Sequence, residues 1–192
     1  MDDGRIDVDA VERTAYELLE RVPEFIWDGE SLPVPVDSIV DNVLGLRVRL
    51  ADDLTSAPGC EDLLSMHLSG LLLTDLGEIW VNAGEAEQWP GRRRFTIGHE
   101  VGHYLLHQDE APRIFCRSGY IGGAEEENSE PLPKPPGEAE ADAFAAALLM
   151  PEHLIRPCFD KYGWNVGVIR ETFGCSHRAT TRRLEAISAG AS

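Results

Sequence analysis

The sequence lacks any apolar run long enough to cross a bilayer, and it has half as many basic as acidic residues. No stretch approaches the ~20 apolar residues that a membrane helix needs. The acidic amino terminus has neither the basic region nor the apolar region of a signal peptide. With 17 Lys and Arg against 34 Asp and Glu, the formal charge of −17 disfavours direct binding of nucleic acid phosphates. We therefore expect a cytoplasmic protein without a membrane partner, whose charge suits a basic partner or serves solubility.

Cysteine is also scarce, which bears on both disulfides and metal binding. The four cysteines are widely spaced and form no Cys-x-x-Cys: Cys60, Cys116, Cys158 and Cys175. In a chain without an export signal, reduced thiols are expected, and these residues are weak candidates for zinc ligands. A chain of 192 residues can bury a core without such links, as one domain or as a domain with a small appendage.

What is present is a His-Glu-x-x-His motif in residues 95–107, which read FTIGHEVGHYLLH. On a helix, residues four apart share a face, so His99 and His103 project together as two nitrogen ligands for one metal ion. Glu100 lies beside them, where a carboxylate can take a proton from activated water. This pattern predicts a Zn²⁺ site, because neutral imidazoles bind zinc at roughly 2.0 Å.

The surroundings of the motif predict how its helix packs. Two glycines four apart, Gly98 and Gly102, would each cost about 1 kcal/mol in a helix, which indicates that another backbone lies close to that face. The apolar series at positions 97, 101 and 105 anchors the opposite side in a core. The arginines at 92–94 oppose the helix macrodipole, so either acidic neighbours pair with them or the helix begins later.

A second, alanine-rich helix is predicted between Gly137 and Pro151, and it offers the third ligand that a zinc peptidase needs. Glu138 and Asp142 are four apart and face the same way. Glu138 can reach the metal, while Asp142 accepts the free N–H of a ligating histidine and fixes its tautomer. Glu140 points elsewhere on this helix, so Glu138 is favoured over it.

Other histidines and tyrosines have weaker claims to the site. On a continuous helix His107 lies about 12 Å from His99, too far for one ion, so we expect it to cap the helix or line the cleft. His67 is expected to be an ordinary strand residue. Three residues are candidates for stabilising the oxyanion, without a pattern that selects one: Tyr120, His153 and Tyr162.

The remaining pattern predicts helices around a small sheet. Helices are expected over 8–22, 36–44, 152–162, 165–173 and 177–187. Strands are expected over 46–50, as a half-buried alternation, and over 65–74 and 78–82, as a hairpin. Residues 51–62 read as a loop, and residues 84–91 interrupt the strand pattern before the central helix. Residues 108–136, rich in Gly, Pro and Glu, are expected to be the least structured part, either a flap beside the site or a functionally silent insertion.

The carboxy-terminal pattern F-G-x-S-x-x-A-x-x-x-R-L, at residues 173–184, resembles a helix-turn-helix unit. Arg178, Arg182 and Arg183 make its second helix basic. DNA contact is one interpretation, but packing against the rest of the chain is favoured by the acidity of the whole.

Residues 94–107, together with E-x-E-A-D-x-F-A-x-x-L-L-M-P at 138–151, resemble the ImmA/IrrE family of zinc metallopeptidases. The resemblance implies a cytoplasmic, gluzincin-like peptidase of bacteria or their mobile elements that cleaves or inactivates a DNA-binding repressor. His99, His103 and Glu138 match the family's metal ligands, and Glu100 matches its catalytic base. Many relatives have Asn where Asp142 stands, which keeps a hydrogen-bonding group.

The sequence thus predicts an α+β fold, with a small antiparallel or mixed sheet packed on an active-site helix. Residues 1–160 are expected to form a metallopeptidase domain, and residues 161–192 a helical tail packed on it. The expected function is Zn²⁺-dependent cleavage of a cytoplasmic regulatory protein, a helix-turn-helix repressor. The alternatives are a metal-stabilised module that sequesters a repressor uncut, which would not need Glu100, and a DNA-binding regulator that uses the tail.

Overall fold

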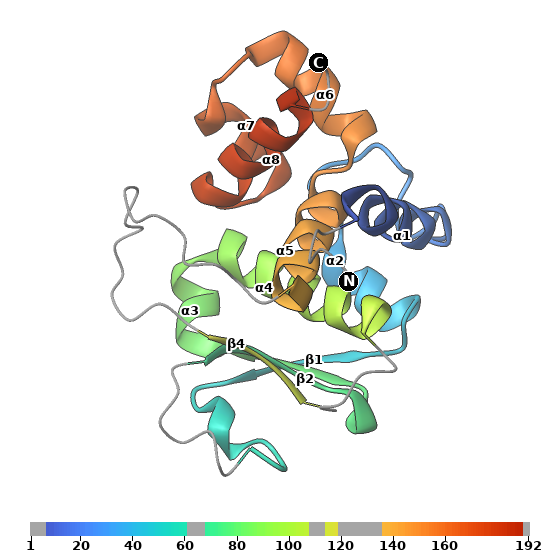
Figure 1. The fold of residues 1–192 in the computed structure, drawn as a ribbon. Coiled ribbons are helices and arrows are strands. Elements are labelled where there is room, and N and C mark those ends of the chain that lie inside the picture. The colour runs from blue at the N-terminus through green and yellow to red at the C-terminus, as the bar shows by residue number, and fades with distance from the viewer. Residues whose placement is uncertain (1–6, 61–67, 108–113, 119–135, 190–192) are drawn as a thin grey trace, which may run out of the picture.

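The computed structural model of the chain describes residues 7–60, 68–107, 114–118 and 136–189. It has an α+β architecture, in which helices stack above one face of a small sheet and a separate group of helices ends the chain (Figure 1). The site helix lies directly on the sheet, and a second helix lies across it. The predicted fold class is confirmed.

Within the described part of the chain, the sheet is mixed and has four strands in the order β1-β3-β2-β4. β1 runs parallel to β3, whereas β2 is antiparallel to both β3 and β4. The predicted hairpin is present, with a short 3₁₀ turn between its strands and Gly77 in the left-handed conformation at φ 61°. The strands are β1 (Arg47–Ala51), β2 (Leu68–Leu73), β3 (Glu78–Asn82) and β4 (Ile114–Ser118).

The predicted helices are confirmed, with ends that agree within about two residues. The amino-terminal helix begins where Asp7 accepts a hydrogen bond from the amide of Ala10 at 3.0 Å, as the capping pattern indicated. The helices of the body are α1 (Val8–Glu20), α2 (Val36–Asn42), α3 (Ala83–Gln88), α4 (Pro90–Leu106) and α5 (Pro136–Leu149). Those of the tail are α6 (Glu152–Tyr162), α7 (Val166–Phe173) and α8 (His177–Ala189).

Three local expectations were wrong. Residues 83–88 form α3, because the side chain of Asn82 caps this short helix by accepting from the Glu85 amide at 3.0 Å. Residues 114–118 form β4, since β2 offers them a strand to pair with. Strand β1 is not cleanly half-buried, because it lies at the sheet edge and Leu50 is 58% exposed. The expectations for His67 and Tyr120, and for most of residues 108–136, lie outside the described residues.

Helices α4 and α5 cross in close contact, as the two glycines of α4 predicted. A Cβ added to Gly98 would lie 3.3 Å from Cβ of Ala145, and one added to Gly102 only 2.9 Å from Cα of Ala141. The small residues therefore let the two backbones approach until side chains from both helices can meet at one point. This crossing positions the site.

The arginines at the start of α4 are paired, which answers the question of how a helix can begin there. Arg92 forms an ion pair with Glu85 of α3, and Arg93 donates to Asp37 of α2 at 2.9 Å. Arg94 donates to the carbonyl oxygen of Val34 at 2.6 Å. Acidic neighbours and a backbone oxygen thus offset the unfavourable charge at the helix start.

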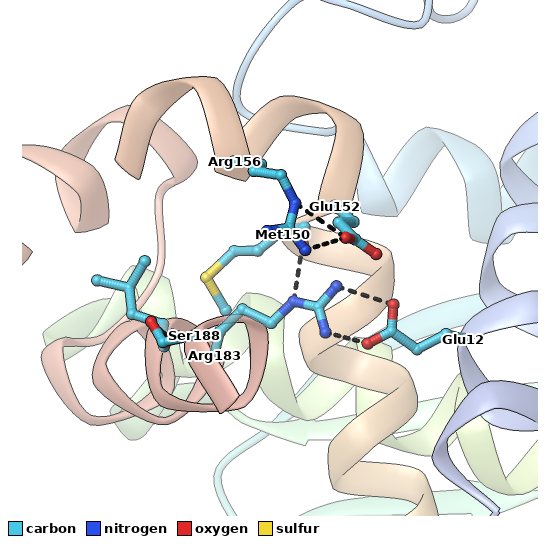
Figure 2. A network of polar contacts seen from close by, with 7 residues as sticks. Glu12, Met150, Glu152, Arg156, Arg183 and Ser188 are labelled. Atoms are coloured by element: carbon cyan, nitrogen blue, oxygen red, sulfur yellow. Dashed lines mark hydrogen bonds and ion pairs between the residues drawn. The ribbon is translucent and has the colours of Figure 1, made fainter. Parts of the chain in front are cut away.

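The carboxy-terminal helices contact both the start of α4 and the end of α5. The turn between α7 and α8 lies so close to Gly91 that an added Cβ would be 2.9 Å from the carbonyl carbon of Cys175. Arg183 of α8 is only 4% exposed, and its Nε donates to the carbonyl oxygen of Met150 at 3.1 Å. Its other two nitrogens form a bidentate pair with Glu12 of α1 (Figure 2).

Among the described residues, no helix is both long enough and apolar enough to span a membrane.

Candidate metal centre

The His-Glu-x-x-His motif lies in the part of α4 that is buried, from Thr96 to His103. His99 and Glu100 are fully buried and His103 is 3% exposed. Ile97 and Val101, on the opposite side of the helix, are buried in the main core, as their spacing predicted. The apolar side of α4 therefore fixes the rotation of the helix, and that rotation sets where the two histidines point.

Three donor groups, the imidazoles of His99 and His103 on α4 and the carboxylate of Glu138 on α5, form a compact triangle. The Nε2 atoms of His99 and His103 are 3.1 Å apart. Oε2 of Glu138 lies 3.4 Å from Nε2 of His99, and its Oε1 lies 3.2 Å from Nε2 of His103. Ligands at roughly 2.0–2.1 Å from a tetrahedral ion are separated by about 3.3 Å, so the donor atoms already have the spacing that one zinc-sized ion requires.

This triangle is the only group of three or more His, Cys, Asp or Glu donors found among the described residues, with all ligand atoms within 4.8 Å of one another. Cys60, Cys158 and Cys175 do not belong to it. Two imidazoles and one carboxylate suit a divalent ion of intermediate softness. The residues present therefore fit a metal ion.

Asp142 supports the triangle from behind. Its Oδ1 lies 2.9 Å from Nδ1 of His99, one turn along α5 from Glu138. A carboxylate at this position accepts a hydrogen bond from Nδ1–H of His99, which favours the tautomer of the neutral imidazole whose Nε2 carries the lone pair. That lone pair points into the triangle, which is the tautomer that a metal ligand needs.

The protonation states of the triangle also suit a metal. Burial lowers the pKa of His103 more than the hydrogen bond with Glu138 raises it, so its imidazole is held neutral. Burial alone would raise the pKa of Glu138, but hydrogen bonds with His103 and His99 outweigh it and bring the pKa below its usual range. Neutral imidazole and ionised carboxylate are the forms that bind metals.

The structure separates the two glutamates at the start of α5. Glu138 contacts both histidines of the triangle, whereas Oε2 of Glu140 lies 3.6 Å from Nε2 of His107. His107 is the C-cap residue of α4, as expected, and its ring is tilted against that of His103 with centroids 5.4 Å apart. His107 and Glu140 therefore flank the triangle from one side.

Two of the three oxyanion candidates lie far from the triangle. His153 and Tyr162 belong to α6, which follows the far end of α5, and 14 residues of helix span about 20 Å. His153 accompanies Tyr16 in a separate cavity of about 650 Å³ between α1 and α6. Neither side chain is placed to act at the triangle.

The sequence analysis missed the part of the sheet that faces Glu100. Gly70 of β2 lies where an added Cβ would be 2.9 Å from Oε1 of Glu100 and 2.4 Å from Cγ2 of Thr96. Next to it, the hydroxyl of Ser69 donates to Glu85 at 2.7 Å. A glycine within a predicted strand was the available signal, because it marks a bulge or a close approach.

An α+β fold with paired helices that hold two imidazoles, one carboxylate and a buried glutamate around one point defines a metallopeptidase-like protein. The family model described as the IrrE N-terminal-like domain, a peptidase family, matches residues 61–185. The chain belongs to this family, as its resemblance to the ImmA/IrrE peptidases predicted.

The chain is similar to one curated protein in sequence and to one solved structure in fold. The chain is 34% identical over 74 residues to the radiation response metalloprotease IrrE of Deinococcus radiodurans, a match that covers 38% of this chain and 20% of the relative. A solved structure, a transcriptional regulator of Mycobacterium tuberculosis, superimposes with a TM-score of 0.53 at 18% identity. That superposition covers 96% of this chain and 56% of the other, and it shows a shared fold. The chain therefore spans only a fifth to about half of the length of these two proteins.

Proposed function

We propose that the chain is a zinc-dependent endopeptidase. The observation that carries the proposal is the triangle of His99, His103 and Glu138 beside the buried carboxylate of Glu100, in which the two Nε2 atoms are 3.1 Å apart and each lies 3.2–3.4 Å from one oxygen of Glu138. Three protein ligands leave one position of a tetrahedral ion open, which is the arrangement of catalytic rather than structural zinc sites. His99, His103 and Glu138 would hold the ion.

The reaction would divide the roles of these side chains. When bound, a zinc ion supplies Lewis acidity, which polarises the carbonyl of a peptide bond and lowers the pKa of water. Glu100 takes a proton from water as its oxygen attacks the carbonyl carbon, and then gives that proton to the leaving amine nitrogen. Asp142 keeps His99 in the tautomer whose Nε2 lone pair points into the triangle, where the ion would bind.

The proposed substrate is a cytoplasmic regulatory protein, in particular a helix-turn-helix DNA-binding repressor. The family resemblance points to such a substrate, and the net charge of −17 suits a basic one. Direct DNA binding by the tail is not part of the proposal, because Arg183 is buried against Glu12 and Met150. Cleavage of one exposed segment would relieve repression.

The test is to incubate the zinc-loaded protein, and separately its Glu100→Gln variant, with the products of neighbouring genes. Fragments are mapped by mass spectrometry. We expect one repressor to be cut at a single exposed segment by the native protein only. Stable binding of a repressor without any Glu100-dependent fragment would instead support sequestration, provided that the metal content of the native protein is one per chain.

A further inference from the structure

The strand that faces Glu100 contains an irregularity at Ser69. In the pairing of β2 with β4, Leu68 lies opposite Ser118 and Gly70 opposite Arg117, so Ser69 is one extra residue on β2. Such a β-bulge turns two consecutive residues toward the same side of a sheet. Bulges often lie next to active sites, where they redirect side chains.

The packing of β2 shows the effect of this bulge. Leu68, Leu71 and Leu73 belong to the core on the face away from α4, whereas Leu72 belongs to the core beneath the helices. Strict alternation would place Ser69 with Leu71 on the far face. Instead Ser69 and Gly70 both face the helices, since Ser69 bonds to Glu85 and Gly70 touches α4.

Ser69 fixes the amino-terminal turn of α4 against β2. Ser69 is 1% exposed, and its hydroxyl donates to Glu85 Oε2 at 2.7 Å and accepts from Arg92 at 3.2 Å. Arg92 also pairs with Glu85 at 3.2 Å. Three elements, β2, α3 and α4, therefore meet in one polar cluster, in which Ser69 and Glu85 are buried and Arg92 is partly exposed.

Gly70 contacts the carboxylate of Glu100 from the side of β2. Arg92, Thr96 and Glu100 are spaced four apart, so they follow one another along the face of α4 that lies on β2. The space for a Cβ at Gly70 is already taken by Cγ2 of Thr96, at 2.4 Å, and by Oε1 of Glu100, at 2.9 Å. The Glu100 carboxylate is thus seated against strand backbone, where a methyl group would displace it.

We infer that the Ser69–Gly70 bulge positions Glu100: Ser69 holds the helix in register with β2, and Gly70 leaves the gap in which the carboxylate sits. These are positioning residues, which act through Glu100 and do not touch the substrate. The inference rests on the proposed function, because it assumes that Glu100 serves the open metal position.

The decisive variant is Gly70→Ala combined with Thr96→Ser, compared with Thr96→Ser alone. Thr96→Ser removes Cγ2 and so relieves the larger overlap, which leaves the new methyl group in conflict only with Glu100. Both proteins are loaded with Co²⁺, whose visible absorption reports ligand binding. Gly84→Ala is the matched glycine control, since the nearest atom to its added Cβ lies at 3.5 Å.

Two probes separate Glu100 from the metal itself. Acetohydroxamate gives up the proton of its hydroxyl oxygen when both of its oxygens bind a metal, and a correctly placed carboxylate accepts that proton. Thiocyanate binds metals as an anion and has no proton to give. We expect acetohydroxamate to bind the double variant at least about tenfold more weakly than Thr96→Ser, with equal thiocyanate affinity and equal Co²⁺ content at a temperature where both proteins are folded.

Equal acetohydroxamate affinity in the two proteins would overturn the inference, and so would an equal loss for both probes. Ser69→Ala provides a second test if the double variant does not fold. Loss of one buried hydrogen bond should weaken acetohydroxamate by about threefold and leave thiocyanate unchanged, and no change for either probe would overturn the role of Ser69. Glu100→Gln distinguishes failure of the proposed function from failure of this inference. If Glu100→Gln binds acetohydroxamate with normal affinity, the proposed function fails, whatever the results for the Ser69 and Gly70 variants.

Discussion

The first two acids of α5 differ in what they contact, and this difference decides which of them can hold a metal. Glu138 lies within 3.4 Å of both histidine nitrogens, whereas Glu140 lies 3.6 Å from His107. A helix turns by about 100° per residue, so Glu138 and Glu140, which are two residues apart, point in different directions and contact different neighbours. Chemistry at this site therefore depends on helix phase as much as on residue type.

We expect Glu138→Ala to weaken zinc binding far more than Glu140→Ala, because only the first variant removes one of the three donor atoms. Asp142→Ala should weaken zinc binding by an intermediate factor of about 10 to 100, since it removes the partner that fixes the tautomer of His99. Competition with a zinc chelator measures all three in parallel. Equal losses for the two glutamate variants would show that the ligand set is wrong.

The crossing of α4 and α5 brings the donor atoms together at the scale of elements. Gly102→Ala should destabilise the protein by about 1–3 kcal/mol, because the new methyl group would lie 2.9 Å from Cα of Ala141, and overpacking exceeds the ~1 kcal/mol that alanine gains in a helix. Urea unfolding with and without zinc measures this. Because separating the helices also moves Glu138, zinc affinity should fall as well.

Gly98→Ala is the matched control for this prediction. Its added Cβ would lie 3.3 Å from Cβ of Ala145, a contact that a small shift of either helix can relieve. Its effect on unfolding should therefore be smaller than that of Gly102→Ala. If the two variants unfold alike, the closest approach of the helices is not at Gly102.

Most elements with a local cause were predictable, although the short helix α3 was missed despite its Asn82 cap, whereas strand pairings between distant residues were not. The spacing of His99, His103, Glu138 and Asp142 follows from helix geometry, and the structure brings all four together. β4 and the bulge at Ser69 required knowledge of which strands pair, because their cause lies about 45 residues away along the chain. The contact of Gly70 with Glu100 likewise joins a strand and a helix that are adjacent only after folding.

At the scale of the whole molecule, one arginine joins the two ends of the chain. Arg183 of α8 links Glu12 of α1 with the carbonyl oxygen of Met150 at the end of α5 (Figure 2). The carboxylate of Glu12 keeps 28% of its surface exposed, so water can partly replace its partner. Arg183 itself is nevertheless almost completely buried, with 4% of its surface exposed.

Arg183→Ala should lower the free energy of unfolding by about 2–4 kcal/mol, because it leaves a buried carbonyl oxygen and a half-buried carboxylate without their donor. Arg182→Ala, next to it but exposed, should change stability by less than about 0.5 kcal/mol. Thermal and urea unfolding of the two variants provides the comparison. If α8 served mainly as a DNA-binding helix, the two arginines would instead matter alike for duplex binding and little for stability.

The negative net charge predicts how the association with the proposed repressor substrate should depend on salt. With a net charge of −17, a basic repressor would be attracted over distances comparable to the Debye length, which falls as salt rises. We expect the association rate constant to drop by about tenfold or more between about 50 and about 300 mM salt, while the dissociation rate constant changes little. The measurement uses Glu100→Gln, which should bind without cutting, and the repressor that yields Glu100-dependent fragments. An association rate that is independent of salt would show that the charge serves solubility rather than recognition.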